Sequence, residues 1–549
     1  MTIFDKFKRH IFILFIILLI AGALRFWQLG QVPVSMSDDE TRLVYNSYSI
    51  WKTGKDVNGL TLPLAFMMGG YAFNPVPIYL VSPFVGFLDI TMFTSRLPFA
   101  IAGVLTVLSL YFLADKLLKN KTAAFLACLA LSFSVWHLQI SRFAYEGGIA
   151  LFFYVLGITV FLYLKKGKIL GTIAAMLIFL LAFYSYSGTK LIFLPLIVIL
   201  AWYKLKELNF KQIIVITIFT VGAFLSFAYL NKTQGAANYG SKQFFFQDVQ
   251  QASLKVELER RGSAAPEFLR RLYHNKLTYW FKIFIGQYQY AFSPQYLFIS
   301  QEGSGIFSVW FQGQLYYIEV PLILLGVLYL FHKRRRALLL LLLFLIIAPL
   351  PSGLGAEPIT YTIRSSFMLP WLMIFVGTGI YSISWFIKNR KLSLTIYLLL
   401  FGTYAYLIGG YLTQYYFEWV KYSPKYYSKS AQDISLFLGK EKKLRNKISI
   451  DGSGSMLLLH YALYNKLDPI IVQKLYKDNP IVLDNITIRD YCIDFKKASP
   501  KDFLKQNSLY IVPVSECRLG RSASGYPHDP YRIISTPDKE LDEWLLYKN

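Results

Sequence analysis

Eleven apolar runs, each near the length that crosses a lipid bilayer as a helix, occupy about half of the first 413 residues of this 549-residue chain. A helical span needs about 20 consecutive apolar residues, and charged residues bound these runs. Hydrophobic residues make up 55% of the chain and charged residues only 16%, below the roughly one quarter of soluble domains. We therefore predict a polytopic α-helical membrane protein with about 11 transmembrane helices. The predicted spans are 11–29, 95–114, 122–140, 147–164, 169–186, 190–203, 212–230, 316–331, 337–350, 365–387 and 393–413.

The basic residues predict how the chain is oriented. Six short stretches at alternate ends of these spans contain 19 Lys and Arg residues and only three acidic residues. Because short cytoplasmic loops are rich in Lys and Arg, these stretches and the N-terminus are predicted to be cytoplasmic. Most of the net charge of +25 is therefore a topology signal, and we expect no nucleic-acid partner. The six stretches are 1–10, 115–121, 165–168, 204–211, 333–336 and 388–391.

A further apolar segment, 76–92, could be counted as a twelfth span. It contains Pro77 and Pro83, and counting it would move most of the basic clusters to the outside. We interpret it as a juxtamembrane helix that lies in the outer interface or dips into it. An odd number of spans then places the C-terminus outside.

These assignments predict two domains. Residues 1–413 form a transmembrane domain with long outer loops at 30–94 and 231–315, and 414–549 form an extracytoplasmic α/β domain. In the second domain, short strand-like runs alternate with helix-like runs. The strand-like runs are KISI, PIIVQ, PIVL, SLYIVPV and YRIIS, and the helix-like runs are SAQDISLFLGKE and MLLLHYALYN.

The cysteines and histidines do not predict a metal site. The three cysteines and six histidines show none of the spacings typical of metal ligands. Cys492 and Cys517 lie in the predicted outer domain, where a disulfide and two free thiols are both compatible with the sequence.

Polar residues of unusual type gather at the predicted outer ends of the spans, and Ser37-Asp38-Asp39-Glu40-Thr41-Arg42 is the strongest such group. Topology does not explain three consecutive acidic residues beside an outer membrane surface. Local structure offers another explanation, because Ser37 and Glu40 have the spacing of a capping box and the aspartates would suit a helix N-terminus. The two interpretations are compatible, since a helix start also positions carboxylates.

Three further groups lie on the same predicted face. An ordinary i, i+4 ion pair also explains the stretch from Arg142 to Glu146, and an interfacial anchor also explains Lys190. The third group runs from Glu357 to Arg364, an arginine on the side with few basic residues. In the second outer loop, 277–298 is typical of an amphipathic helix followed by an aromatic loop, suited to stacking on sugar rings or lying on lipid.

The sequence Asp39-Glu40-Thr41-Arg42 resembles a motif of membrane glycosyltransferases with the GT-C fold, of the protein O-mannosyltransferase and aminoarabinose (lipid A) transferase type. In that family an Asp-Glu pair opens the first outer loop, and D-E-T-R is a form found in the aminoarabinose enzymes. Three more segments resemble the family in order along the chain. They are TSRLPFAIAGVLTVLSLYFLADKLL, SRFAYEGGIALFF and PSGLGAEPITYTIRSSFMLP.

The resemblance implies an enzyme of the cell envelope that transfers a sugar from a polyprenyl-phosphate carrier to an acceptor at the outer membrane face, with inversion. By position, Asp39 would be the general base, with Glu40 orienting it and Glu146 as a second catalytic acid. The residues that would hold the lipid phosphate or the sugar are Arg42, Arg142, Lys190, Glu357 and Arg364. The partners would be the lipid-linked sugar, membrane lipids, and a glycan, lipid or protein acceptor.

The sequence also departs from the family. Asn74-Pro75-Val76-Pro77 stands where aminoarabinose transferases carry Lys-Pro-Pro, so a phosphate-binding lysine is missing. The Trp-Trp-Asp motif of oligosaccharyltransferases is absent, which disfavours oligosaccharide transfer to asparagine. Asp38 and Glu40 could hold a divalent metal, but we expect that none is required. The alternative function is a transporter or flippase of lipid-linked sugars, which would need polar residues along a central pathway.

Overall fold

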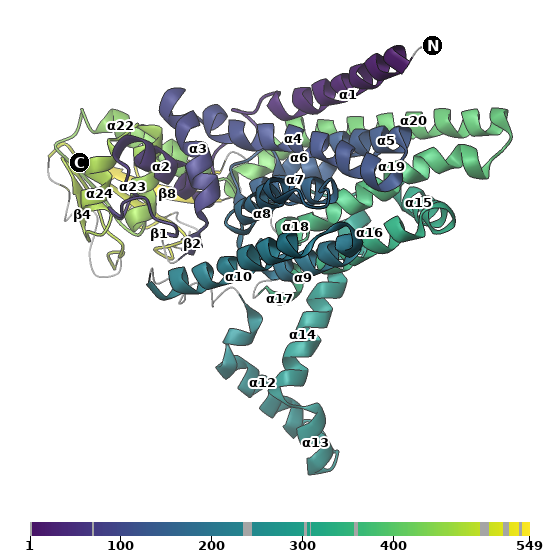
Figure 1. Ribbon diagram of the computed structural model, residues 1–549. Coiled ribbons are helices and arrows are strands. Elements are labelled where there is room, and N and C mark those ends of the chain that lie inside the picture. The colour runs from purple at the N-terminus through teal and green to yellow at the C-terminus, as the bar shows by residue number, and fades with distance from the viewer. Residues whose placement is uncertain are drawn as a thin grey trace. The chain divides into compact units, whose positions relative to one another are not determined.

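The computed structural model describes residues 3–68, 71–233, 244–300, 305–307, 309–355, 361–494, 504, 506–519, 526–536 and 541–548. The chain divides into two compact units. The first unit comprises Met1–Trp27, Phe99–Arg142 and Glu146–Leu412, and the second comprises Gln28–Pro98, Phe143–Tyr145 and Thr413–Asn549. Figure 1 shows their helices and strands.

The first unit is helical in its described residues, as the predicted fold class requires. Each predicted span coincides with helical residues, so the prediction of a polytopic helical protein is confirmed. The helices are α1 (Ile3–Phe26), α4 (Met92–Leu118, which starts in the second unit), α5 (Lys121–Phe133), α6 (Val135–Ile140), α7 (Glu146–Leu162), α8 (Ile169–Phe183), α9 (Ser187–Lys204), η1 (Leu205–Glu207), α10 (Phe210–Thr233), η3 (Phe245–Gln247), α12 (Val249–Arg261), α13 (Glu267–Tyr273), α14 (Lys276–Tyr290), η4 (Gln295–Ile299), α15 (Glu319–Lys333), α16 (Arg335–Ile347), α17 (Leu350–Leu354), α18 (Tyr361–Arg364), η5 (Ser366–Met368), α19 (Leu369–Phe386) and α20 (Arg390–Thr413).

Seven helical stretches in the described part of the chain are long and apolar enough to cross a membrane. The other predicted spans are shorter helices: α5 has 13 residues, α7 has 17, and α8 and α15 have 15 each. The seven are Arg9–Phe26, Met92–Leu118, Ser187–Glu207, Phe210–Thr233, Arg335–Leu354, Thr362–Phe386 and Arg390–Lys425.

The predicted single span at 122–140 is wrong, because the helix breaks at Ser134 into α5 and α6. The Ser134 hydroxyl accepts the backbone N–H of His137 at 3.3 Å, which makes it the N-cap of α6. Buried Arg25 donates to the carbonyls of Leu131 and Ser132 at the end of α5, and to His137 Nδ1 at 2.6 Å. The arginine thus supplies donors to the last-turn carbonyls of α5, although the Leu131 carbonyl also accepts the backbone N–H of Ser134 at 3.3 Å.

Helices α15 and α19 approach each other closely at two glycines. A Cβ on Gly326 would collide with the backbone of Phe375, and one on Gly379 would collide with the backbone of Leu322. Small residues at helix crossings let backbones approach, which is how apolar helices associate in lipid.

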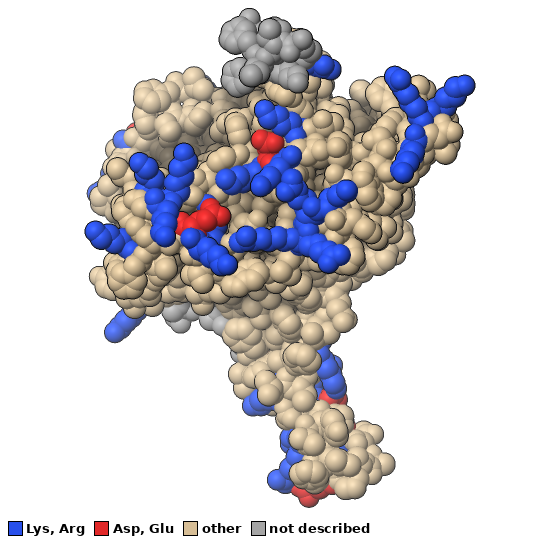
Figure 2. Space-filling model, turned by 45° about the vertical axis from the view of Figure 1, so that its right-hand side comes forward, with Lys and Arg blue, Asp and Glu red and all other residues tan. Residues whose placement is uncertain are grey.

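Basic residues follow the ends of several apolar helices in the first unit. Lys204 ends α9 and Lys206 lies within η1. The basic stretch 333–336 spans the end of α15 and the start of α16, and 388–391 spans the start of α20. Figure 2 shows a face on which Lys and Arg side chains gather beside few acidic ones. The positive-inside rule predicts that such loops are cytoplasmic.

The second unit combines helices with a six-stranded sheet among its described residues. The strand order is β4-β5-β3-β6-β8-β7, in which β3 pairs in parallel with β5 and β6 and the other pairs are antiparallel. Its elements are α2 (Asp38–Thr53), β1 (Phe66–Met68), β2 (Tyr71–Phe73), α3 (Pro75–Phe87), η6 (Gln414–Glu418), α21 (Trp419–Tyr422), η7 (Ser423–Lys425), α22 (Lys429–Glu441), β3 (Lys447–Ile450), α23 (Gly454–Tyr464), α24 (Pro469–Leu475), β4 (Ile481–Leu483), β5 (Ile486–Ile488), β6 (Ser508–Pro513), β7 (Arg532–Ser535) and β8 (Asp542–Lys548).

Most of the predicted C-terminal elements are confirmed, but PIIVQ forms helix α24 instead of a strand. Asp468 caps this helix by accepting the backbone N–H of Ile470 at 2.8 Å, and Pro469 takes the first helical position. Both residues favour a helix start over a strand. The strands β5 and β8 were not predicted. Cys492 and Cys517 form a disulfide, with their Cα atoms 5.5 Å apart.

The crossing of α15 and α19 generates a prediction. We expect Gly379→Val to lower the stability of the first unit by about 1–3 kcal/mol, because the branched side chain must displace the backbone at Leu322. Gly402→Val is the matched control, since a Cβ at Gly402 in α20 meets nothing within 4 Å. Thermal unfolding of both variants in detergent measures the difference, and equal melting temperatures would contradict the prediction.

Candidate active site

The acidic turn predicted from the sequence opens helix α2. The Ser37 hydroxyl accepts the backbone N–H of Glu40 at 3.2 Å, and the Glu40 carboxylate accepts the backbone N–H of Ser37 at 3.1 Å. The capping box is therefore confirmed. It places Asp38, Asp39 and Glu40 in the first turn of α2.

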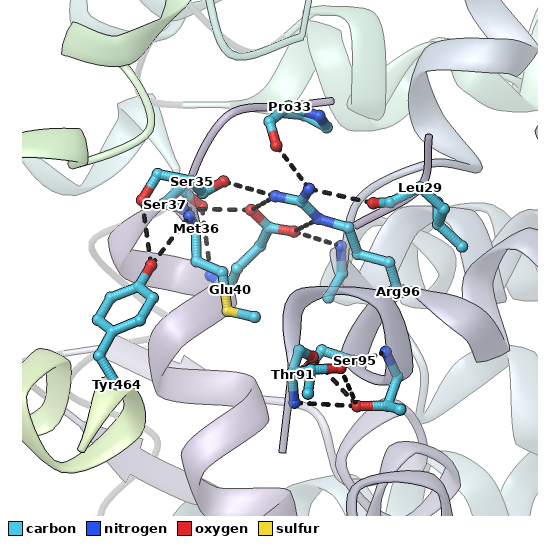
Figure 3. Close-up of polar contacts among 12 residues, drawn as sticks. Leu29, Pro33, Ser35, Met36, Ser37, Glu40, Thr91, Ser95, Arg96 and Tyr464 are labelled. Atoms are coloured by element: carbon cyan, nitrogen blue, oxygen red, sulfur yellow. Dashed lines mark hydrogen bonds and ion pairs between the residues drawn. The ribbon is translucent and has the colours of Figure 1, made fainter. Parts of the chain in front are cut away.

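A buried ion pair between Glu40 and Arg96 fixes this helix start (Figure 3). Neither side chain has any exposed surface. The Arg96 Nε donates to Glu40 Oε1 at 3.0 Å, and Nη2 donates to Oε2 at 3.2 Å. The remaining guanidinium N–H groups donate to backbone carbonyls of the segment before α2, those of Leu29, Pro33 and Ser35.

Hydrogen bonds satisfy both charges of this pair. Glu40 Oε1 also accepts the backbone N–H of Ala144 at 2.8 Å, so each of its oxygens has at least two donors. A buried pair is tolerated only when its lone pairs and protons are satisfied in this way. The network thus ties three separated parts of the second unit: the chain before α2, the start of α4 and the 143–145 segment.

Asp38 is held by residues from the C-terminal part of the second unit. Its Oδ1 accepts the Ser428 hydroxyl at 2.7 Å and lies 3.0 Å from His460 Nε2. The other ring nitrogen of His460 lies 3.3 Å from Thr41 Oγ1, and the ring stacks on Tyr464. Burial alone would raise the pKa of Asp38, but the hydrogen bond and charge of His460, with Ser428 and Arg42, lower it to about 2.

Asp39 has a different environment. Its side chain is 44% exposed, close to the 48% of Asp38, but its partner is Arg42, whose Nη1 donates to Asp39 Oδ1 at 3.2 Å. Burial and the charges of Asp38 and Glu40 raise the pKa of Asp39, and together they outweigh the opposing effect of Arg42. Two neighbouring carboxyls therefore have pKa values pushed in opposite directions, a pattern found at acid–base sites.

More C-terminal residues interact electrostatically with this turn. The charge of Glu516 interacts with that of Asp38, and the Glu516 carboxylate accepts the Ser453 hydroxyl at 3.1 Å. Tyr476 interacts electrostatically with Arg42. Ser453 and Glu516 follow the adjacent parallel strands β3 and β6. Polar groups at the carboxyl ends of parallel strands thus contribute to the surroundings of the acidic turn.

In the first unit the structure brings Glu146 and Lys190 together. Glu146 is buried at the first position of α7, and Lys190 lies on α9, where the two charges interact. The Lys190 Nζ lies 5.6 Å from the ring centre of Phe183 and 5.3 Å from that of Phe227. The predicted roles of both residues remain predictions.

Buried Arg142 donates to three backbone carbonyls around the end of α1. Its Nη1 donates to Leu24 and Arg25 at 2.8 and 2.9 Å, and its Nη2 donates to Trp27 at 2.8 Å. A phosphate would compete with these hydrogen bonds, and the contact of Arg142 with substrate stays a prediction.

Arg364 ends helix α18 and is half-buried. A Cβ on Gly355 would collide with its guanidinium, so the glycine makes room for the arginine. Thr362, two residues before Arg364 in α18, is held by two hydrogen bonds. Its carbonyl accepts Trp136 Nε1–H, and its hydroxyl accepts an N–H of Gln314 Nε2. Glu357 lies outside the described residues.

Four polar residues of these networks were not among the predicted site residues: Arg96, His460, Ser428 and Arg25. Arg96 and Arg25 were detectable as charges within apolar runs, which are costly unless they have partners. His460 was detectable as a polar residue inside the apolar helix MLLLHYALY. Their partners lie far away in the sequence, so the pairing itself had no local signal.

The hydrogen bonds of Glu40 decide whether Asp38 and Glu40 could bind a divalent metal ion together. Among the described residues, no group of three His, Cys, Asp or Glu side chains is arranged to hold an ion. Both oxygens of Glu40 are engaged by Arg96 and backbone N–H groups, so binding a metal there would break the buried pair.

Comparison with solved structures identifies the fold. ArnT from Cupriavidus metallidurans bound to undecaprenyl phosphate aligns with a TM-score of 0.51 at 10% sequence identity, over 99% of this chain and 98% of that one. The same enzyme in the apo state gives 0.50 at 11% identity, over 97% of each chain. No family model and no curated protein sequence matches the chain. The likeness therefore shows the GT-C fold of this aminoarabinose transferase.

A second group of similar structures is longer than this chain. The archaeal oligosaccharyltransferase AglB from Archaeoglobus fulgidus, in complex with an inhibitory peptide and a dolichol-phosphate, aligns with a TM-score of 0.46 at 14% identity. The alignment covers 85% of this chain but only 64% of that one.

The buried pair generates the first prediction of this site. Arg96→Met should lower the free energy of unfolding by about 3–5 kcal/mol, because it leaves Glu40 charged and buried without its partner. Arg261→Met is the control, since it breaks an exposed i, i+4 pair with Glu257 and should cost less than about 1 kcal/mol. Chemical denaturation of the purified proteins compares them. Similar losses in the two variants would refute the assigned importance of the buried pair.

The opposite pKa shifts of Asp38 and Asp39 generate the second prediction. The lowered pKa of Asp38 contributes stability above about pH 4 that is lost as the pH falls toward about 2. The raised pKa of Asp39 works the other way, because stability is lost as the pH rises through it. At neutral pH we therefore expect Asp38→Asn to lower the melting temperature and Asp39→Asn to maintain or raise it. Melting curves recorded from about pH 3 to pH 8 test both signs, and the reverse order of the two variants would contradict them.

Proposed function

We propose that this chain is a glycosyltransferase that moves a sugar from a polyprenyl-phosphate donor to an acceptor hydroxyl, with Asp39 as the general base. The Asp39 carboxylate carries the proposal. It is half-exposed, has a raised pKa and lies beside Arg42 at the start of a helix that a buried ion pair fixes in place. A base of this kind needs solvent access, enough proton affinity and a fixed position.

The reaction balances with the groups present. Asp39 takes the proton of the acceptor hydroxyl while the hydroxyl oxygen forms a bond to the anomeric carbon of the sugar. The bond from that carbon to the phosphate oxygen breaks, and the polyprenyl phosphate leaves with the electron pair. Attack from the face opposite the phosphate inverts the configuration. Arginine suits the departing phosphate because it can donate to two of its oxygens.

Each predicted site residue has a place in this proposal. Glu40 orients the acidic turn through its pair with Arg96, so it is a positioning residue. Arg42 offers positive charge next to the base. The proposed phosphate or sugar ligands of the first unit are Arg364, Lys190 and, by resemblance alone, Arg142 and Glu357, with Glu146 as the second acid beside Lys190.

We further propose that catalysis needs no metal ion, because the oxygens of Glu40 that would complete a site with Asp38 are held by Arg96. Membrane localisation fits the seven apolar helices. We place the acidic turn and the C-terminal sheet on the extracytoplasmic side, where the positive-inside rule puts them. The acceptor is a glycan, a lipid or a protein with an accessible hydroxyl.

The test measures release of polyprenyl phosphate, because this product is the same for every acceptor. Purified protein is given polyprenyl-phosphate sugars and candidate acceptors. We expect Asp39→Asn to lower the turnover rate by about 100- to 10,000-fold, the contribution of a general base. Asp89→Asn is the control, because Asp89 lies outside α2 and is an exposed partner of Lys466.

Each outcome has a defined meaning. Activity that survives in Asp39→Asn would refute the role of the base. Movement of intact lipid-linked sugar across vesicles, without release of polyprenyl phosphate, would favour a flippase over a transferase.

A further inference from the structure

Helices α12, α13 and α14 form an ordered arm, residues 249–290, between the apolar helices α10 and α15 (Figure 1). Asp248 caps α12 by accepting the backbone N–H of Gln251 at 2.7 Å. Asn275 and Thr278 form a capping box at the start of α14. Glu259 of α12 then joins the helices, because it pairs with His274 at 2.9 Å and with Lys282 of α14 at 3.4 Å.

Each helix of the arm has a pair of large apolar side chains at i and i+4 that faces outward. These six side chains are 50–74% exposed. A helix on a soluble surface buries such a stripe against its neighbours. Here Ala252 and Val256 of α12 are buried instead, so the larger side chains are left outside. The pairs are Leu254 and Leu258, Phe268 and Leu272, and Leu277 and Phe281.

The arm is also basic. Residues 249–290 contain seven Lys and Arg and three Glu, a net charge of +4. Helices that combine exposed Leu and Phe with Lys and Arg are typical of elements that lie in the interface of a membrane. Basic side chains near an anionic membrane surface strengthen binding to it.

The base of the arm is attached to the segment that precedes Arg364. The Tyr288 hydroxyl of α14 donates to the carbonyl of Ile346 at 2.7 Å, and a Cβ on Gly353 would collide with Phe284. Gly353 and Gly355 belong to the stretch in which Gly355 makes room for Arg364. A contact of the arm with lipid would therefore be made next to a proposed phosphate ligand.

We propose that the arm is a membrane-binding element whose apolar stripe inserts among acyl chains and whose basic side chains bind anionic phospholipid headgroups. The charge and the two flanking apolar helices favour a lipid surface over a soluble partner. The inference does not depend on sugar transfer, because lipid contact and release of polyprenyl phosphate are measured separately.

The test places an environment-sensitive fluorophore at single cysteines in the full chain, reconstituted in vesicles of phosphatidylglycerol and phosphatidylcholine. In Leu272→Cys, and in Leu254→Cys as a second position, we expect quenching by brominated lipid and protection from aqueous iodide. Lys447→Cys, at an exposed position of β3, should show the reverse. The native free cysteine, Cys128, is buried, which limits background labelling.

A second variant tests the contribution of the basic side chains of the arm to lipid binding. Arg270→Gln together with Arg271→Gln should weaken the lipid-bound state of the arm roughly 30-fold in vesicles rich in phosphatidylglycerol, at about 1 kcal/mol per charge. It should have little effect in phosphatidylcholine alone. The proposal would be overturned if fluorophores on the arm remain accessible to quenching by aqueous iodide in both kinds of vesicle. Protection that depends on protein concentration and not on lipid would also overturn it, because that result indicates a second copy as the partner.

Discussion

The buried pair between Glu40 and Arg96 is the interaction on which the candidate site depends. Without it, the carbonyls of Leu29, Pro33 and Ser35 would lose their Arg96 donors, and the first turn of α2 would lose the ion pair that fixes it. The pair is costly to bury and stabilises only because hydrogen bonds satisfy every charged group in it. The pair fixes the first turn of α2 and thereby the positions of Asp38 and Asp39.

The fixed first turn of α2 explains why the pKa values of Asp38 and Asp39 shift in opposite directions. Both side chains are about half-exposed, but they differ in their partners. His460 and Ser428 lower the pKa of Asp38, whereas Asp39 pairs with Arg42 and has a raised pKa. The negative charge of Asp38 adds to the proton affinity of Asp39. The two aspartates thus differ within one helical turn, because among the described residues the C-terminal part of the second unit hydrogen-bonds to Asp38 and not to Asp39.

The helices and the acidic turn could be predicted from sequence because their signals are local. Apolar length gave the spans, and the spacing of Ser37 and Glu40 gave the capping box. The break at Ser134 was not predicted, because a count of apolar residues over 122–140 changes little when one of them is a polar capping residue. Arg96 and His460 were missed as site residues because their partners are 56 and 422 residues away. Only the fold brings such residues together.

The central claim is that Asp39 accepts a proton during sugar transfer, and the pH dependence of a single turnover tests it most directly. The rate should rise with pH through an ionisation above the ordinary aspartate value of about 4, because the base must be a carboxylate and its pKa is raised. The residual rate of Asp39→Asn should lack this rise. A rate that is independent of pH in this range, or a rise that persists in Asp39→Asn, would contradict the account.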